Sequence, residues 1–289
     1  MRRCIACGAA PVCEDWSCAA CGSVPEHRDG IVLLAPDAIE MGRGFDPASF
    51  GHLLATEEQS FWFRGRNELI LWALRRYFPS TGSLLELGCG TGYVLRGIRA
   101  AYPSMRLAGA ELYPEGLRIA SSRVPDAEWL QIDVTRMPFD REWGVVGAFD
   151  VLEHIRDDEA ALAGMHDAAR PGAGILITVP QHPWLWSRAD EYAMHERRYG
   201  RAELVSRVQR AGLEVLRVTS FVSALLPAMA FLRWRERRSG AAFDPTREHA
   251  SAARLPALDH ILRTERALIR RGANLPAGGS LLLVARRPA

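Results

Sequence analysis

The segment at residues 84–92 constrains the fold more than any other part of this chain. Its apolar residues lead through an acid into three glycines at alternate positions, Gly88, Gly90 and Gly92. The apolar residues predict a buried strand. The glycines predict a turn whose backbone comes close to a ligand, because glycine accepts positive φ and has no Cβ. A helix expected over residues 93–102 would direct its N-terminal amides at the same ligand, so the segment predicts a site for a nucleotide-like group.

Strand-like and helix-like patterns alternate from about residue 82 to the C-terminus. Such alternation predicts a parallel sheet with helices on both faces. Strands are expected at residues 83–87, 105–111, 128–132, 144–149, 175–179, 213–219 and 280–285. Dinucleotide-binding folds also carry a glycine turn, but with the spacing G-x-G-x-x-G. The spacing G-x-G-x-G found here, with an acid two residues before it, argues against that class.

Three motifs resemble those of the class I methyltransferases that depend on S-adenosylmethionine (SAM). Residues 84–92 resemble motif I of that family, and residues 170–174 are similar to the turn before its fifth strand. Residues 150–154 (Asp-Val-Leu-Glu-His) are similar to a stretch common in its small-molecule enzymes, including those of ubiquinone and menaquinone biosynthesis. The resemblance covers about residues 60–289. It implies a Rossmann-like α/β fold whose seven-stranded sheet has the order 3-2-1-4-5-7-6, with strand seven antiparallel.

The cofactor site is expected where the strands end, and Glu111 is its most informative residue. Glu111 follows the glycines by about twenty residues and ends the second predicted strand, where an acid can bond both hydroxyls of a ribose. A surface glutamate that begins a helix is the alternative. The resemblance implies that Asp133 bonds the adenine amino group and that Val134 packs on the ring, with a turn-forming Asp133 as the alternative. The residues predicted to bind SAM are Glu86, Gly88, Cys89, Gly90, Gly92, Glu111, Leu112, Asp133, Val134 and Asp150.

Two C-x-x-C-G motifs near the N-terminus predict a metal site. Their cysteines are Cys4 and Cys7 in the first motif and Cys18 and Cys21 in the second, with ten residues between Cys7 and Cys18. Each motif places two thiolates on one turn, and four such sulfurs suit a tetrahedral Zn²⁺. Four protein ligands leave no open position for catalysis, so the zinc is expected to be structural. A redox dithiol is the alternative, and Cys13 is interpreted as a bystander.

The chain divides into three parts on this interpretation. Residues 1–35 form a zinc ribbon, residues 36–80 a linker and helices over the cofactor site, and residues 81–289 the SAM-binding domain. Within the last part, residues 220–279 separate the two final strands and are long enough for helices of their own, which predicts a lid. The aromatic residues at 61–63 begin a helix expected to close the SAM pocket, and a hydrophobic staple is the alternative.

The methyl acceptor is expected against residues 180–199, beyond the carboxyl ends of the strands. That stretch holds two Trp, two Tyr, two His and three Arg, which suits a wall for a planar or anionic group. A satellite hydrophobic cluster is the alternative. The apolar lid at 220–279 and its flanking arginines favour a lipid-linked acceptor at a membrane surface. The sequence therefore predicts a small-molecule or lipid-linked substrate.

Methyl transfer from a sulfonium is an in-line displacement, in which the enzyme positions the nucleophile and excludes water. A base is needed when the acceptor is a hydroxyl or a carbon acid. The catalytic candidates are His195, His154 and Asp190, in that order, because histidine titrates near neutral pH. A turn-capping, structural His154 is the alternative.

Charge is spread unevenly along the chain, although the net charge is only +2. Residues 201–289 contain 16 Arg and 7 acids, which favours an anionic substrate or an acidic membrane surface, with solvated helix faces as the alternative. Met1 and two arginines lead straight into cysteines rather than into an apolar run, so a cytoplasmic protein is expected. The apolar lid and the basic C-terminal third add the expectation of peripheral contact with a membrane. Residues 195–199 resemble a stretch of a bacterial methyltransferase subgroup, which implies a bacterial source.

Two other functions compete with the small-molecule enzyme. The first is an RNA methyltransferase guided by the zinc ribbon, although residues 150–153 do not have the N-P-P-(Y/F) pattern of base-amine methylation. The second is a non-catalytic scaffold with the SAM-binding fold, which the intact glycines and Glu111 argue against. Nucleic acid is therefore the less favoured partner.

Overall fold

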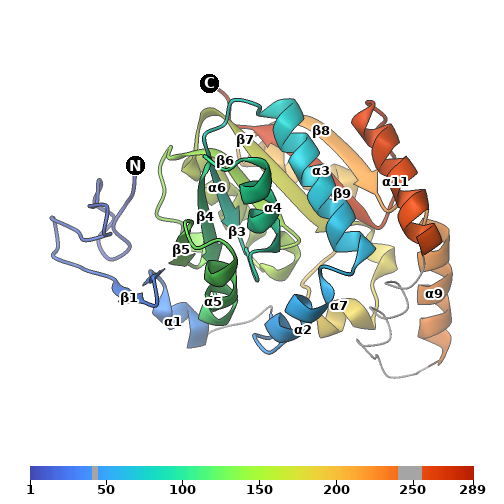
Figure 1. The fold of residues 1–289 in the computed structure, drawn as a ribbon, viewed down its shortest axis with the longest axis horizontal. Coiled ribbons are helices and arrows are strands. Elements are labelled where there is room, and N and C mark those ends of the chain that lie inside the picture. Colours follow the sequence, from blue (N-terminus) through green and yellow to red (C-terminus); the bar gives the residue numbers. More distant parts are fainter. Residues whose placement is uncertain (41–44, 240–255) are drawn as a thin grey trace.

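The computed structural model describes residues 1–40, 45–239 and 256–289. Residues 41–44 of the predicted linker and 240–255 of the predicted lid lie outside the described residues. Helices cover both faces of a central sheet, and the N-terminal segment joins one edge of that sheet (Figure 1).

The central sheet has nine strands in the order β1-β2-β5-β4-β3-β6-β7-β9-β8. In chain order these are β1 (Glu26–Arg28), β2 (Ile31–Leu33), β3 (Ser83–Leu87), β4 (Arg106–Glu111), β5 (Glu128–Gln131), β6 (Trp143–Phe149), β7 (Ala169–Pro180), β8 (Glu214–Phe221) and β9 (Ser280–Arg286). In the spatial order β2-β5-β4-β3-β6-β7, each strand runs parallel to its neighbours. Strand β9 is antiparallel to both β7 and β8.

The strand count and full order differ from the predicted seven-stranded sheet. The seven expected strands keep their relative positions, β5-β4-β3-β6-β7-β9-β8, and the last of them in sequence is antiparallel as predicted. The two additional strands come from the N-terminal segment, because β2 pairs in parallel with the free edge of β5 and β1 pairs with β2. An exposed strand edge offers unpaired amides and carbonyls, and here residues 26–33 cover it.

Two groups of helices sandwich the sheet, as the alternation of strands and helices predicted. One face is covered by α3 (Phe61–Tyr77), α4 (Tyr93–Ala101) and α5 (Pro114–Arg123), and the other by α6 (Asp158–Ala168) and α8 (Arg201–Arg210). Successive strand residues point to opposite faces. Leu84 therefore packs with the first helix group, whereas Leu85 and Leu87 pack with the second.

The turn predicted at residues 170–174 is an irregularity inside β7 rather than a turn before it. Gly172 has φ of +75°, as a turn glycine would. Backbone pairing with β6 nevertheless begins at Ala169 and resumes at Gly174 after a shift in register. The strand therefore starts earlier than expected, because the bulge re-enters the same ladder.

The N-terminal segment is fastened to the sheet edge by side chains as well as by β2. The ring of Trp16 packs edge-on against Phe139, with 5.6 Å between the ring centroids. Arg2 bonds Glu128 at 2.7 Å and Glu142 at 3.1 Å. Residues 1–35 are therefore continuous with the main sheet.

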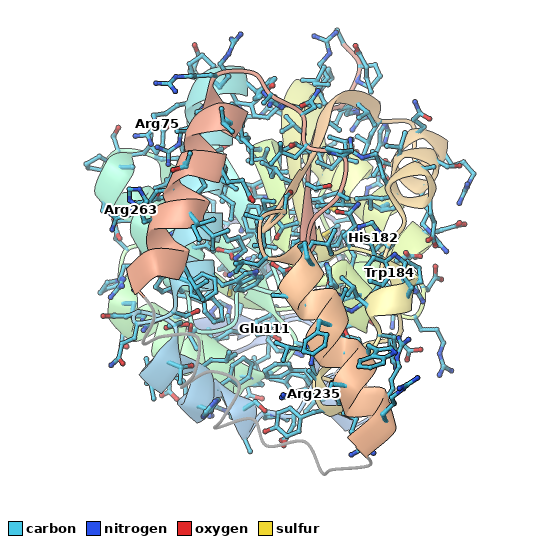
Figure 2. All side chains as sticks on the ribbon, turned by 90° about the vertical axis from the view of Figure 1, so that its right-hand side faces the viewer. Arg75, Glu111, His182, Trp184, Arg235 and Arg263 are labelled. Atoms are coloured by element: carbon cyan, nitrogen blue, oxygen red, sulfur yellow. The ribbon has the colours of Figure 1, made fainter. Side chains whose placement is uncertain are left out.

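The predicted lid contains two described helices, α9 (Leu226–Ser239) and α11 (Pro256–Arg270), which Figure 2 shows on the face toward the viewer. Glu265 of α11 accepts backbone hydrogen bonds from Val222, Ser223 and Ala224, which holds the chain at the entrance to α9. Within the described part of the chain, no helix is long and apolar enough to cross a bilayer.

Candidate functional site

A cavity of about 1150 Å³ lies beyond the carboxyl ends of β3, β4, β5 and β6. The short helix α2 (Ser49–Thr56), the start of α3 and the inner side of α9 also border it. Nine of the ten residues predicted to bind SAM line this cavity, the exception being Gly92. His154 and His195 line it as well, whereas Asp190 lies behind its wall. One cavity therefore joins the predicted cofactor residues to the predicted acceptor residues.

The glycine turn takes the conformation that its sequence predicts. Gly88, Gly90 and Gly92 have φ of 59°, 51° and 73°. A Cβ on Gly88 would lie 2.5 Å from the side chain of Val151, and one on Gly92 would lie 2.8 Å from Cβ of Ala120. Gly92 thus serves close packing between the turn and α5 rather than the cavity wall.

Glu111 lies at the end of β4, where its carboxylate organises the glycine turn. Its oxygens accept hydrogen bonds from the backbone amides of Gly90 at 3.1 Å, Leu112 at 2.7 Å and Tyr113 at 3.2 Å. Burial raises the pKa of Glu111, and these amides oppose the shift. The alternative of a surface glutamate is wrong, because the side chain is buried and lines the cavity.

Glu86 is a buried acid inside β3, directly beneath the cavity. Burial raises the pKa of its carboxyl to about 8, although the positive charge of Arg66 opposes the shift. One oxygen, Oε2, has no hydrogen-bond partner among the described residues. The neighbouring thiol of Cys89 is also buried, and burial raises its pKa.

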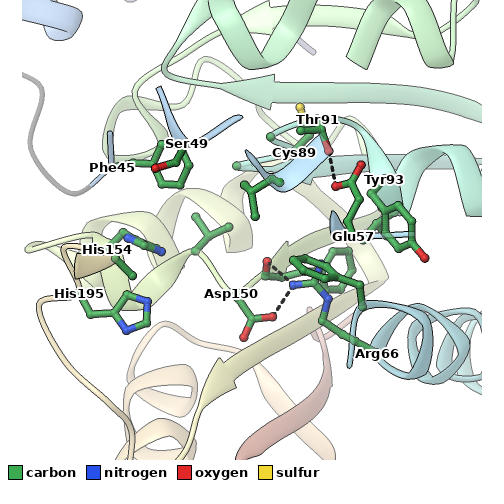
Figure 3. Close-up of a pocket in the computed structure, with 18 of the residues that line it drawn as sticks. Phe45, Ser49, Glu57, Arg66, Cys89, Thr91, Tyr93, Asp150, His154 and His195 are labelled. Carbon is green, nitrogen blue, oxygen red and sulfur yellow. Dashed lines mark hydrogen bonds and ion pairs between the residues drawn. The ribbon is translucent and has the colours of Figure 1, made fainter. Parts of the chain in front are cut away.

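Arg66 is a site residue that the sequence analysis did not identify. Its guanidinium lies in α3 and donates to Oδ2 of Asp150 at 2.6 Å, with the ring of Trp62 4.6 Å away (Figure 3). Thr178 also donates to Asp150, at 2.7 Å. Arg66 and Asp150 are 84 residues apart, so no local pattern could have indicated the pair. The aromatic entry of α3 that contains Trp62 was correctly placed at the cavity.

A second group missed by the sequence analysis covers the glycine turn. Glu57, just after α2, is buried and accepts a hydrogen bond from Thr91 at 2.7 Å (Figure 3). Arg123 of α5 forms an ion pair with Glu57 and also donates to Thr91. Phe50 of α2 approaches Gly90. Helix α2 is thereby fixed across the mouth of the cofactor end.

Asp133 and Val134, predicted to contact the adenine, both line the cavity. Asp133 accepts hydrogen bonds from the amide and the hydroxyl of Thr135, at 2.9 and 2.7 Å, through one carboxylate oxygen. It therefore caps the 3-10 helix that begins at Val134, which is the turn-forming role given as the alternative. The second carboxylate oxygen of Asp133 takes no part in these two hydrogen bonds. The turn-forming role is therefore compatible with the predicted bond to an adenine amino group.

His195 and His154 lie together at the other end of the cavity (Figure 3). Their rings are 4.6 Å apart between centroids and nearly perpendicular. Nδ1 of His195 is 2.9 Å from Oδ1 of Asp190, which also accepts from Arg198 at 2.7 Å. Burial raises the pKa of Asp190, but the bond from His195 and the charge of Arg198 outweigh it and bring the pKa to about 2. Asp190 is therefore ionised and positions His195.

The aromatic stretch at residues 180–199 forms the cavity wall only in part. Ala189, Tyr192, Ala193, His195 and Glu196 line the cavity, whereas Trp184 and Trp186 do not. Trp184 is about half exposed, at 51%. The prediction that the tryptophans form a binding wall is therefore not met by the described residues.

Among the described residues, two groups of side chains could each hold a metal ion. Cys4, Cys7, Cys18 and Cys21 form one group, and Glu153, His154 and His195 form the other. In each group the ligand atoms all lie within 4.8 Å of one another. The sulfurs of Cys4 and Cys21 are 3.7 Å apart, as are those of Cys7 and Cys18. The exposed Cys13 is not part of the cluster, as expected.

A family model described as a methyltransferase domain matches residues 55–218, more than half of the chain. The chain belongs to the methyltransferase-domain family. The matched residues include the glycine turn, Glu111, Asp133 and the stretch from Asp150 to His195, whereas the parts of the cavity wall before residue 55 and after residue 218 lie outside the match.

Curated relatives match this chain over part of their length. A probable SAM-dependent methyltransferase of Mycolicibacterium smegmatis is 27% identical over 55% of this chain and 61% of its own length. The demethylmenaquinone methyltransferase of Chlorobaculum tepidum is 31% identical over 35% of this chain and 41% of its own. The trans-aconitate 2-methyltransferase of Azoarcus sp. is 26% identical over 35% and 40%. The chain thus spans about two to three fifths of the length of these relatives.

Solved structures share the fold of the methyltransferase domain. A chain of the complex between the Haloferax volcanii Trm112 methyltransferase activator and a methyltransferase has a TM-score of 0.56 at 20% identity, covering 84% of this chain and 94% of its own. Phosphoethanolamine N-methyltransferase 2 of Haemonchus contortus, in complex with SAM, has a TM-score of 0.51 at 18% identity, covering 77% and 53%. At these identities the likeness establishes the fold alone.

Proposed function

We propose that the protein is a SAM-dependent methyltransferase that acts on a small-molecule or lipid-linked acceptor. The observation that carries the proposal is the single cavity that joins the glycine turn and Glu111 to His154 and His195. Methyl transfer needs the cofactor and the acceptor in line within one space that excludes water. A single cavity lined by both sets of residues supports the proposal.

The cofactor end fits the nucleoside part of SAM. The ribose would lie against Glu111, and the adenine against Leu112, Asp133 and Val134, all of which line the cavity. The methionine part would lie over the glycine turn and near Arg66, whose guanidinium can face a carboxylate. SAM, when bound, supplies an electrophilic methyl group. The protein holds it and keeps water away.

The acceptor end combines apolar walls with the two histidines. Leu225, Met229 and Leu232 of the lid segment line the cavity, which suits an acceptor with an apolar part. Phe231 and Trp234 of α9 are about half exposed and their rings are stacked beside Arg238, a combination that suits the surface of an anionic membrane. We therefore propose a cytoplasmic protein in peripheral contact with a membrane. The relatives named for demethylmenaquinone and trans-aconitate are compatible with a small-molecule acceptor.

His195 is proposed to assist deprotonation of the acceptor, ahead of His154. Because Asp190 accepts at Nδ1, that nitrogen carries the proton and Nε2 has a free lone pair. Asp190 itself is buried and strongly bonded, so we propose that it is a positioning residue rather than a base.

The four N-terminal cysteines are proposed to bind a structural Zn²⁺. With Zn–S bonds of about 2.3 Å, a tetrahedral site has sulfurs about 3.8 Å apart, and the sulfur pairs here are separated by 3.7 Å. The bound metal would stabilise the segment that adds β1 and β2 to the sheet. The alternative of an RNA methyltransferase rests on this ribbon, and nothing else in the described part of the chain favours it.

An assay of S-adenosylhomocysteine release tests the proposal. Purified protein is incubated with SAM and a panel of quinols, phenols, carboxylic acids and lipid-linked derivatives. Release that depends on one acceptor class, and that His195→Ala reduces, supports the proposal. Stoichiometric SAM binding without release on any small-molecule or lipid-linked acceptor would contradict it, and release on RNA alone would favour the alternative.

A further inference from the structure

We infer that Glu153, His154 and His195 bind a divalent metal ion at the acceptor end of the cavity, separate from the cysteine site. The inference rests on the proposed function, because the ion would face the space assigned to the acceptor. Glu153 and His154 belong to the 3-10 helix η2 (Leu152–His154), which follows β6, and His195 follows α7 (Arg188–Tyr192). One ligand atom from each residue lies within 4.8 Å of the other two.

Glu153 is the buried acid of this group, and one of its oxygens lacks a hydrogen-bond partner among the described residues. Its side chain is 1% exposed, and the oxygen without a partner is Oε2. A buried acid without a partner is costly, either as a desolvated charge or as a neutral acid with an unmet hydrogen bond. A divalent cation would neutralise this carboxylate where it now stands.

His195 already has the outer partner that a metal-bound histidine requires. Metal-binding histidines usually donate their other ring N–H to a carboxylate, which fixes the tautomer and the ring. Asp190 provides that acceptor at 2.9 Å, and its carboxylate is held in turn by Arg198 and by the amide and hydroxyl of Ser187. Nε2 is left to bind the ion.

The backbone keeps the two ligand segments in register. The amide of Glu196 donates to the carbonyl of Glu153 at 2.7 Å, so residues 195–196 are tied directly to η2. Two ligands on one ion with bonds of about 2.1 Å lie at most about 4.2 Å apart. Side-chain rotations that move the ligand atoms by less than about 1 Å would therefore close the site around an ion.

The ligand set indicates which ions would bind. Two imidazoles and one carboxylate suit first-row divalent ions such as Mn²⁺, Fe²⁺, Co²⁺ or Zn²⁺ and leave positions open. Because His154 and His195 line the cavity, an ion held by them would lie beside the space assigned to the acceptor and could polarise an acceptor oxygen. In the metal-bound protein the Nε2 lone pair is a metal ligand, so the ion rather than the imidazole lowers the pKa of the acceptor. The inferred substrate class is accordingly an acceptor with a hydroxyl or carboxylate oxygen.

Titration of the full-length, zinc-loaded protein with Mn²⁺, followed by electron paramagnetic resonance, tests the inference. Mn²⁺ prefers oxygen and nitrogen ligands, so the cysteine site does not compete for it. The expected result is one Mn²⁺ per chain, with binding weakened by at least about tenfold in Glu153→Gln and in His195→Gln. Glu159→Gln, which removes an exposed acid of α6, is the matched control and should bind Mn²⁺ as the unchanged protein does.

Calorimetric titration of the same preparations with SAM separates the two proposals. SAM binding without any Mn²⁺ binding, or equal Mn²⁺ affinity in Glu153→Gln, would overturn the metal site and leave the proposed function standing. Undiminished S-adenosylhomocysteine release after removal of divalent ions other than the ribbon zinc would also overturn it. Mn²⁺ binding that depends on Glu153 in a protein that does not bind SAM would instead count against the proposed function alone.

Discussion

Nδ1 of His195 lies 2.9 Å from Oδ1 of Asp190, and this contact fixes the orientation of a ring that also lines the cavity. The two residues are five positions apart, since Asp190 lies in the first turn of α7 and His195 lies beyond the end of that helix. A capping box at Ser187 holds Asp190 at the start of that helix. A local helix-capping pattern thus orders a side chain at the acceptor end of the site.

Asp190→Asn is expected to reduce turnover without weakening SAM binding. The amide can donate to Nδ1 and favour the wrong tautomer, in which Nε2 carries the proton and no longer has a lone pair for acceptor or metal. Loss of such an orienting carboxylate lowers kcat by about 10²-fold or more. The rate of S-adenosylhomocysteine release and the SAM dissociation constant are measured together. Equal loss in Glu191→Gln, the neighbouring acid, would show that the effect is not specific to this contact.

Glu86 is expected to make the stability of the apoprotein fall as the pH rises. Its folded pKa is about 8 against an ordinary 4.5, so between these values the folded chain holds a proton that the unfolded chain has released. The contribution of Glu86 to the free energy of unfolding is therefore complete below pH 4.5 and is lost as the pH rises through about 8. Relative to Glu86→Gln, the free energy of unfolding should fall by up to about 1.4 kcal/mol per pH unit in that window. Urea denaturation at several pH values measures it, and parallel pH profiles would exclude the shift.

Removal of the ribbon metal is expected to destabilise the sheet edge. Cys7→Ser should abolish the single bound zinc and lower the melting temperature, because β1, β2 and the Trp16 contact depend on the folded segment. Cys13→Ser removes a cysteine outside the cluster and should keep both the zinc and the melting temperature. Metal analysis and differential scanning fluorimetry provide the readouts. A zinc-free Cys7→Ser protein with unchanged melting temperature would refute a stabilising role.

Gly109 in β4 is expected to tolerate no side chain. A Cβ there would lie 2.4 Å from the ring of Trp129 and 2.8 Å from the sulfur of Cys89, both buried. Overpacking of this kind costs about 1–3 kcal/mol, so Gly109→Ala should lower the free energy of unfolding by that amount and disturb the glycine turn. Gly51→Ala in α2 meets no atom within 4 Å and serves as the control. Denaturant unfolding of both variants decides the comparison.

Local sequence patterns were sufficient for the strands and the cofactor turn. The apolar residues Leu84, Leu85 and Leu87 predicted a strand that ends just before the first glycine. The strand β3 has the predicted limits, Ser83–Leu87. Glu111 was found because the carboxyl ends of neighbouring parallel strands meet at one edge. These features depend on residues close in sequence or on a regular topology.

The features that were missed depend on contacts between distant residues. The edge strand β2 joins β5 through the buried Gln131, whose side chain bonds the backbone of Ala35, 96 residues away. The Arg66–Asp150 ion pair and the Glu57–Thr91 bond likewise join residues before β3 to the loops that follow β6 and β3. The exposed position of Trp184 follows from the path of residues 180–199, which composition does not specify.

The most direct test of the central claim is a calorimetric titration of the full-length protein with SAM, repeated with Glu111→Ala and with Glu115→Ala as the exposed control in the next helix. Glu111 lines the cavity and fixes the glycine turn through three amides. The account predicts one SAM per chain and a dissociation constant at least about tenfold higher in Glu111→Ala, which corresponds to about 1.4 kcal/mol. Absence of SAM binding, or equal affinity in all three proteins, would contradict it.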